Sequence, residues 1–252
     1  MNGTRLAYIS YGKGTHKMRV LKAENYADLS RKAALLIAAQ IIKKPHSVMG
    51  FATGSTPEGA YAELVALYKQ GTVSFKDITT FNLDEYYGLS ASHSQSYAYF
   101  MRDKLFGHID LPAESIHIPN GNSGNAAAEC AKYEKDIEVA GGIDMQLLGI
   151  GRNGHIGFNE PDEVFSPATH LVNLTENTLE ANARFFSSLE EVPTQAITMG
   201  VGTIMRAKSV LLIANGAQKK EIIQKTISGA VTPQVPASIL QFHPDVTVLY
   251  CD

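Results

Sequence analysis

Cysteine, excess charge and long apolar runs are all scarce in this sequence, and each scarcity excludes a class of protein. The chain has two cysteines, Cys130 and Cys251, and no C-x-x-C motif, so we expect a reduced, cytoplasmic setting. A formal net charge of −3 gives no electrostatic reason to expect a nucleic-acid partner. No apolar run approaches the roughly 20 residues of a membrane-spanning helix, so no membrane partner is expected.

The length of 252 residues, 44% of them hydrophobic, suffices for one large α/β domain or two small ones. No internal repeat, low-complexity tract or dividing linker is present, so we expect one domain over residues 18–252. Residues 1–17 lack the apolar core of a signal peptide. Because Met18 directly precedes a predicted strand, we interpret residues 1–17 as a non-native leader and leave them out of the fold.

Short apolar runs alternate with segments of helical spacing along the rest of the chain. The predicted strands are 19–22, 48–52, 78–83, 115–118, 144–150, 169–174, 209–214 and 246–250. The predicted helices are 26–43 with Asn25 as N-cap, 57–69, one around 97–105, 126–139, 176–184, 196–206 and 218–228. This alternation predicts an α/β fold with a mostly parallel sheet covered by helices on both faces.

The stretch from Asp144 to Pro161 is the strongest functional signal in the chain. A short apolar run is followed by closely spaced glycines, namely Gly149, Gly151, Gly154 and Gly157. Glycine permits positive φ and close approach of a backbone to a ligand, so we expect a tight loop after a strand. Open α/β sheets bind ligands at the carboxyl ends of strands. His155 and Glu160 in this loop are therefore a candidate acid/base pair.

The same loop matches G-x-G-x-x-G, the pattern of dinucleotide-binding proteins, but its context does not. That pattern needs a helix directly behind it and an acidic residue about 20 residues further on. Gly157, Asn159 and Pro161 interrupt any such helix, and the acidic residue nearest the expected place, Glu176, belongs to a predicted helix start. We therefore expect no nicotinamide cofactor.

A second candidate site lies where the predicted strand 48–52 runs into Thr53-Gly54-Ser55-Thr56-Pro57 and a helix. The first N–H groups of a helix lack partners and carry positive potential, which suits an anion. Pro57 suits the first helical position, Thr56 can serve as N-cap, and the hydroxyls of Ser55 and Thr56 add donors. The loop lacks the G-K-[ST] ending of a nucleotide P-loop, so a single phosphate fits better than a nucleotide. The alternative is a plain capped helix.

Charged residues elsewhere could complete such a site. Arg184 and Lys219 could supply the cationic side of a phosphate pocket, although each taken singly could be a solvated surface charge. Asp84 and Glu85 end the predicted strand 78–83, and alternation along a strand lets only one of them face a pocket. The alternative is that both are solvated turn residues. We expect the anion loop, the acidic pair and the His155 loop to meet at one sheet edge.

Metal and serine-nucleophile chemistry find little support. The histidines form no H-x-H or H-x-x-x-H, and His155 with Glu160 cannot complete a metal site. No G-x-S-x-G motif is present.

Three long motifs in order, supported by two shorter ones, resemble those of glucosamine-6-phosphate deaminases, and the likeness runs from about Met18 to the C-terminus. They are FATGSTP from Phe51, FNLDEY from Phe81, GIGRNGHIGFNEP from Gly149, Asn120-Gly-Asn122 and ANARFF from Ala181. The resemblance implies a Rossmann-like fold and conversion of glucosamine 6-phosphate and water to fructose 6-phosphate and ammonia, without a cofactor.

The resemblance also implies roles for individual residues. Asp84 would move the C2 proton to C1, His155 would open the sugar ring, and Glu160 would orient His155. The phosphate would lie on Gly54, Ser55 and Thr56 with Arg184 and Lys219, and Glu85 and Gly154 are expected to contact substrate. Many members carry Asp where this chain has Asn153, so we expect an altered pH profile. The loop segment 161–167 is a candidate mobile lid.

Larger, hexameric members are activated by an N-acetylated sugar phosphate through basic residues just after the central loop. Residues 168–172 contain no Arg or Lys, and the chain stops at Asp252 where those members continue. We therefore expect an unregulated, monomeric enzyme. The alternatives are a 6-phosphogluconolactonase of the same fold and a non-catalytic sugar-phosphate-sensing module, and Asn159-Glu160-Pro161 favours the deaminase.

Overall fold

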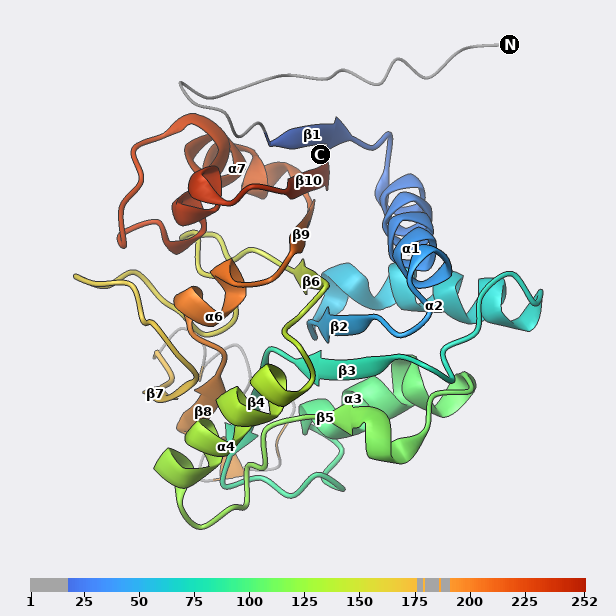
Figure 1. The fold of residues 1–252 in the computed structure, drawn as a ribbon. Coiled ribbons are helices and arrows are strands. Elements are labelled where there is room, and N and C mark those ends of the chain that lie inside the picture. Colours follow the sequence, from blue (N-terminus) through green and yellow to red (C-terminus); the bar gives the residue numbers. More distant parts are fainter. Residues whose placement is uncertain (1–17, 176–178, 180–185, 187–190) are drawn as a thin grey trace.

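The computed structural model describes residues 18–175, 179, 186 and 191–252. In this part of the chain a seven-stranded sheet forms the centre of the molecule (Figure 1). Its strands, in order across the sheet, are β1 (Arg19–Lys22), β10 (Val246–Cys251), β9 (Ser209–Asn215), β6 (Met145–Leu148), β2 (Val48–Phe51), β3 (Thr79–Asn82) and β5 (Ile116–His117). Every neighbouring pair is parallel, which confirms the predicted parallel sheet.

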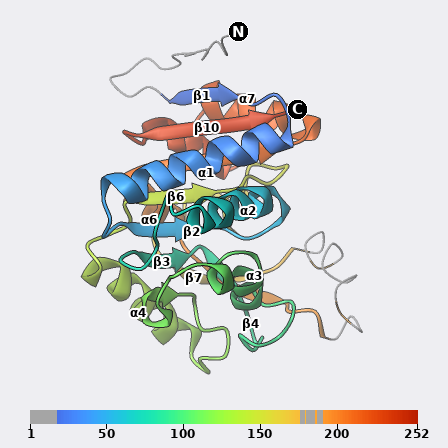
Figure 2. The same cartoon turned by 90° about the vertical axis from the view of Figure 1, so that its right-hand side faces the viewer.

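Helices cover both faces of this sheet. The longer helices are α1 (Tyr26–Lys43), α2 (Ser55–Lys69), α3 (Tyr97–Lys104), α4 (Ala126–Val139), α6 (Val201–Met205) and α7 (Lys220–Ser228). The 3₁₀ helices are η1 (Phe106–His108), η2 (Ala113–Ser115), η4 (Ala217–Lys219) and η5 (Pro236–Phe242). Helices α1 and α2 lie side by side over one face, whereas α6 and α7 lie on the other (Figures 1 and 2). The prediction of a sheet covered on both faces is therefore confirmed.

Helix α1 shows how closely local sequence chemistry can specify an element. The side chain of Asn25 accepts a hydrogen bond from the N–H of Asp28, as an N-cap residue does, and the helix begins at Tyr26 as predicted. Leu29, Ala33 and Ile37 are fully buried and face the sheet. Their helical spacing provides the apolar stripe that holds α1 against the core.

A second, smaller sheet was not predicted. It is antiparallel, with β8 (Gln195–Thr198) between β4 (Asp84–Tyr87) and β7 (His170–Asn173). The prediction of a helix over 196–206 is therefore wrong for its first residues, because Ala196, Ile197 and Thr198 are fully buried in β8, the central strand of this sheet. The helical pattern is real only from Val201 onward. Asp84 and Glu85 likewise belong to a strand of their own.

Leu83 joins the two sheets. Its N–H donates a hydrogen bond to the carbonyl of Phe51 on β2, and its carbonyl accepts one from Met199, just after β8. β3 ends at Asn82 and β4 begins at Asp84, so Leu83 alone separates them. One residue therefore carries the chain from the large sheet to the small one.

Helices α2 and α7, which carry predicted site residues or follow them, begin at other residues than predicted. Helix α2 begins at Ser55, two residues earlier than predicted, and its N-cap is Gly54 without any side-chain capping bond. The prediction of Thr56 as N-cap is therefore wrong. The chain enters α7 through the 3₁₀ turn η4, so the predicted start at 218 marks that turn. The predicted leader 1–17 and most of the predicted helix 176–184 lie outside the described residues.

Candidate active site

The carboxyl ends of three neighbouring strands, β6, β2 and β3, carry the predicted site. These strands are adjacent in the large sheet and run parallel, so the segments after them meet at one edge (Figure 1). The anion loop (residues 53–57) follows β2, and the central, glycine-rich loop (residues 149–161) follows β6. β4, which begins with Asp84, follows β3. The expected meeting of the three segments is confirmed.

The anion loop leaves its donors open. Gly54 has φ 100°, which favours glycine, and the space around its Cα is empty, so a ligand can approach the backbone closely. Gly54 and Ser55 are exposed and Thr56 is half-buried. The first N–H groups of a 15-residue helix therefore lie beside accessible hydroxyls, an arrangement that binds anions.

Lys219 is held next to this edge by the central loop. Its Nζ donates a hydrogen bond to the carbonyl of Ile150 at 2.6 Å. Burial, together with the charge of Arg152, lowers the pKa of the Lys219 ammonium. The side chain is half-buried, so it is not the fully solvated surface charge of the alternative reading. Arg184, the other predicted cation, lies outside the described residues.

The central loop folds back on itself, and its backbone packs against the imidazole ring of His155. The N–H of Gly151 donates to the carbonyl of His155 at 2.9 Å. A Cβ added at Gly151 would lie 2.3 Å from the imidazole, so the ring rests directly on this glycine. Gly154 has φ 91° and turns the chain between them. Glycine at these positions is needed for the ring to lie where it does.

His155, Glu160 and Asn153 form a connected group. The imidazole Nδ1 lies 2.9 Å from Glu160 Oε1, although the ring plane does not aim an N–H on Nδ1 directly at that oxygen. Asn153 Nδ2 donates to Glu160 Oε2 at 2.5 Å, and Asn153 Oδ1 accepts from the backbone N–H of His155 at 3.2 Å. Burial acts to raise the pKa of Glu160, but its contacts with His155 and Asn153 outweigh burial and hold that pKa below its usual value.

Asp84 lies against the same loop. Its carboxylate is buried, with the residue 6% exposed, and a Cβ added at Gly157 would lie 3.5 Å from Asp84 Oδ2. Gly157 has φ 59°, and the N–H of its neighbour Phe158 donates to Thr198 Oγ1, opposite Asp84 in the small sheet. Burial, reinforced by the charge of Glu85, raises the pKa of Asp84 to about 8. A perturbed carboxylate in this place is the expected mark of a functional group.

The carboxylate of Glu85 binds the start of α3, whereas the sequence led us to expect a contact with substrate. Its carboxylate accepts hydrogen bonds from the N–H groups of Tyr86, Tyr97 and Ala98, each at 2.9 Å, and so anchors the first turn of α3. Burial raises the pKa of Glu85 to about 6, while these bonds act to lower it. Both carboxylates are buried, so the alternative of two solvated turn residues is wrong. With its oxygens committed to backbone N–H groups, Glu85 is a support for α3.

The sequence reasoning missed an aromatic group beside Asp84. The rings of Tyr97 and Phe158 stack at 6.2 Å with an interplanar angle of 6°, and Tyr86 lies 4.7 Å from Tyr97. The Tyr97 hydroxyl donates a hydrogen bond to the Tyr86 hydroxyl at 3.3 Å, and burial raises the pKa of Tyr97. Tyr97 was read only as an apolar position of a helix, and nothing in its spacing separates that role from one at a site.

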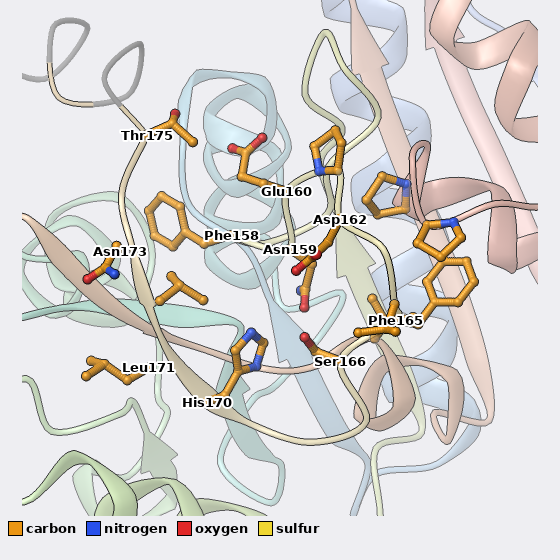
Figure 3. Close-up of a pocket in the computed structure, with 16 residues that line it drawn as sticks. Phe158, Asn159, Glu160, Asp162, Phe165, Ser166, His170, Leu171, Asn173 and Thr175 are labelled. Atoms are coloured by element: carbon orange, nitrogen blue, oxygen red, sulfur yellow. The ribbon is translucent and has the colours of Figure 1, made fainter.

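A cavity of about 380 Å³ lies beside the central loop. Its lining includes Glu160, Pro161, Asp162, Val164 to Ser166, and His170 to Asn173 of β7 (Figure 3). The described residues around it carry the carboxylates of Glu160 and Asp162 but neither lysine nor arginine. The cavity therefore shares Glu160 with the site but offers no strong cation. Motion of residues 161–167 stays a prediction.

Within the described ranges, no group of three or more His, Cys, Asp or Glu side chains could hold a metal ion. Among the same residues, no helix is long and apolar enough to cross a bilayer.

Comparison with known proteins places this chain in a family. The family described as glucosamine-6-phosphate isomerases/6-phosphogluconolactonase matches residues 22–249. A glucosamine-6-phosphate deaminase of Lachnoclostridium phytofermentans is 57% identical over 234 residues, covering 93% of this chain and 99% of its own. A second, from Thermoanaerobacter pseudethanolicus, is 55% identical over 232 residues and covers 92% of each chain.

Solved structures agree with this placement. One described as a monomeric glucosamine-6-phosphate deaminase is 47% identical, with a TM-score of 0.89, and the match covers 93% of this chain and 97% of the other. A 6-phosphogluconolactonase from Thermotoga maritima is only 17% identical, with a TM-score of 0.74 over 92% of this chain and 99% of its own, and shows the shared fold alone. The chain belongs to the glucosamine-6-phosphate isomerase/6-phosphogluconolactonase family.

Proposed function

We propose that this protein is a glucosamine-6-phosphate deaminase, which converts glucosamine 6-phosphate and water to fructose 6-phosphate and ammonia. The observation that carries the proposal is the position of Asp84, a buried carboxylate against Gly157 of the loop that also holds His155 and Glu160. An open anion loop ends the neighbouring strand. The family's deaminases, at 55% and 57% identity, support the same reaction.

Asp84 is the proposed base. A proton on the carbon next to an aldehyde is weakly acidic, and a carboxylate fixed beside it contributes roughly 10²–10⁴-fold as a general base. Asp84 takes the C2 proton and returns it to C1, while the aldehyde oxygen gains the proton that the C2 ammonium group loses. Water then hydrolyses the resulting iminium at C2 with release of ammonia. Burial holds the pKa of Asp84 at about 8, and the substrate's ammonium group would lower it by charge attraction. Substrate binding therefore favours the ionised base.

His155 is the proposed group for opening the sugar ring. It would take the C1 hydroxyl proton and supply one to the ring oxygen, acting as general base and general acid. Glu160, at 2.9 Å from Nδ1, stabilises the protonated ring, and Asn153 holds the second Glu160 oxygen. The imperfect alignment of Nδ1 is of the kind that tightens when substrate binds.

The phosphate would be bound by the anion loop. The open N–H groups and hydroxyls from Gly54 to Thr56 supply donors, and Lys219 supplies positive charge. Arg184 remains a proposed second cation, and Gly154 a proposed backbone contact. Glu85 is not proposed as a ligand, because its carboxylate caps α3, and we assign it the role of holding Tyr97 beside Asp84.

We also propose that the enzyme is a monomer and has no anionic activator. One similar structure, at 47% identity, is described as monomeric, which supports a monomer. The cavity that borders Glu160 offers two carboxylates and no lysine or arginine among its described residues, which supports an enzyme without an anionic activator there. Both cysteines are free and buried, as suits a cytoplasmic enzyme.

The test is ammonia release from glucosamine 6-phosphate by the wild type and by Asp84→Asn. We expect the wild type to release ammonia and the variant to lose at least about 10²-fold in kcat, the worth of a general base. Asp245→Asn, a change of the same chemistry in an exposed ion pair with Arg19, should keep full activity. Equal rates for Asp84→Asn and wild type would remove the base role.

A lactonase remains the second candidate, because it shares the fold. Hydrolysis of 6-phosphogluconolactone needs a base for water but no proton transfer between C2 and C1. Activity on the lactone without ammonia release would assign the site to hydrolysis. Phosphate binding without turnover of either compound would instead indicate a sensing module.

A further inference from the structure

A tyrosine hydroxyl from α1 lies within the first turn of α2. The hydroxyl of Tyr26 donates a hydrogen bond to the carbonyl of Ser55 at 2.9 Å and accepts one from the N–H of Gly59 at 2.8 Å. In a regular α-helix, the carbonyl of Ser55 and the N–H of Gly59 are the two groups that pair with each other, four residues apart. The tyrosine hydroxyl thus contacts both members of a backbone pair in the first turn of α2.

The packing of α1 on α2 makes room for this contact. A Cβ added at Gly59 would lie 2.2 Å from Ser30 Oγ and 3.0 Å from Tyr26 Oη, so a larger residue at 59 would push both side chains away. Tyr26 also packs against the hydrophobic core. Helices α1 and α2 lie side by side over this length (Figure 2). The hydroxyl is therefore fixed from two sides.

The bond to Ser55 has a consequence at the other end of the same peptide unit. In a planar trans peptide the C=O of Ser55 and the N–H of Thr56 point in opposite directions. The Thr56 N–H is one of the unpaired donors at the start of α2. Holding the carbonyl from α1 fixes the direction of that N–H, and a hydrogen bond at the oxygen makes the N–H a stronger donor.

We propose that Tyr26 is a positioning residue for anion binding, whose hydroxyl orients the Thr56 N–H toward the phosphate group of the substrate. The inference rests on the proposed function of the anion loop, and it assigns the affinity of that loop partly to a residue on another helix. It also explains why the turn carries glycine at 59, since the hydroxyl needs the space that a side chain would fill.

The test is Tyr26→Phe, which removes the hydroxyl and keeps the ring. Without the hydroxyl, the carbonyl of Ser55 loses its bond to α1, while the backbone bonds of the 15-residue helix keep α2 folded, so the melting temperature should change little. We expect the KM for glucosamine 6-phosphate and the Kd for inorganic phosphate, measured by calorimetry, to rise together by about 3- to 10-fold, the worth of one net hydrogen bond. The kcat should change less than about twofold, because the contact is remote from the reacting carbons.

Two further variants make the result specific. Tyr68→Phe removes a hydroxyl from the far end of α2 and should leave KM and Kd unchanged. Gly59→Ala should displace Tyr26 and raise the phosphate Kd in the same direction, and it decides the question if Tyr26→Phe does not fold. An unchanged phosphate Kd in folded Tyr26→Phe would overturn the inference, as would a lower melting temperature with loss of kcat alone.

Phosphate calorimetry does not depend on turnover, so the two proposals can fail separately. A wild type that binds phosphate but releases no ammonia would contradict the deaminase assignment. A wild type that releases ammonia while Tyr26→Phe binds phosphate equally well would contradict the positioning role alone.

Discussion

Replacing Asp84 with asparagine should make the folded protein more stable while it removes activity. The wild-type carboxylate is buried, and burial with the charge of Glu85 raises its pKa from the usual 3.8 to about 8. Its ionised form is therefore disfavoured in the folded state relative to the unfolded chain. Asparagine has nearly the same shape and no charge, so the variant avoids this penalty at every pH.

The pH dependence follows from the direction of the shift. A carboxyl whose folded-state pKa lies above its unfolded value contributes stability that is complete below pH 4, and this stability is lost as the pH rises through 8. Between these limits the free energy of unfolding falls by about 1.4 kcal/mol per pH unit, so about 3–4 kcal/mol is lost between pH 5 and pH 8. At about 2–4 °C per kcal/mol for a chain of this size, the difference in melting temperature should widen by roughly 10 °C.

The assay is thermal unfolding of wild type and Asp84→Asn at pH 5, 6, 7 and 8. Glu85 titrates in the same direction in both proteins, so the difference between them isolates Asp84 to first order. The exposed control Asp245→Asn should show no widening gap. A variant less stable than wild type at pH 8, or a gap independent of pH, would refute the argument that the base is held in an unfavourable environment.

Three further changes test the rest of the site. Gly157→Ala forces a side chain to φ 59° with Cβ 2.8 Å from Thr198 Oγ1. Thermal unfolding should show a loss of about 1–3 kcal/mol of stability, and ammonia release should show kcat reduced at least about tenfold. An unchanged kcat would contradict the close packing of the loop on Asp84. Asn153→Asp replaces a donor to Glu160 by a like charge and should raise the Glu160 pKa, moving the acid limb of the kcat/KM profile upward by about one pH unit; a superimposable profile would exclude this coupling. Lys219→Met should raise the KM for the sugar phosphate about 10- to 100-fold with a smaller change in kcat, since a charge-assisted contact is lost; an unchanged KM would remove Lys219 from the phosphate site.

The large sheet and its helices could be predicted because each element carries its own signal. The strand runs are short, apolar and separated by helical spacing, and Asn25 marks a helix start that the structure places at Tyr26. The proximity of the anion loop, Asp84 and the central loop could also be predicted, since parallel strands must place their carboxyl ends on one edge.

The small sheet could not be predicted because the sequence of β4 resembles a turn and that of β8 resembles a helix. β4 begins with Asp84 and Glu85, two carboxylates that resemble a solvated turn, and their burial depends on β8, which lies more than a hundred residues further along the chain. The start of β8 fits a helical pattern that continues into α6, and only pairing with β4 and β7 decides between the two. Local propensity is overridden there by tertiary contacts.

Side-chain roles were the least predictable part. Whether Glu85 faces a ligand or a helix depends on where α3 lies, and its bonds to Tyr97 and Ala98 span 12 and 13 residues. Thr56 was a reasonable cap by residue type, but the helix begins earlier, and its N-cap residue Gly54 has positive φ and no side chain that could cap. Such choices depend on geometry that a single sequence does not contain.

The single-residue connection at Leu83 affects which molecules the site can accept. The anion loop is built on one sheet and Asp84 on the other, so the span between them is fixed by how two separate layers are fastened at this residue. In the proposed reaction, the sugar phosphate must bridge that span with its own carbon chain. A sugar phosphate one carbon shorter would leave either its charged tail unanchored or its acidic carbon beyond the carboxylate, which makes molecular length itself a basis for selection.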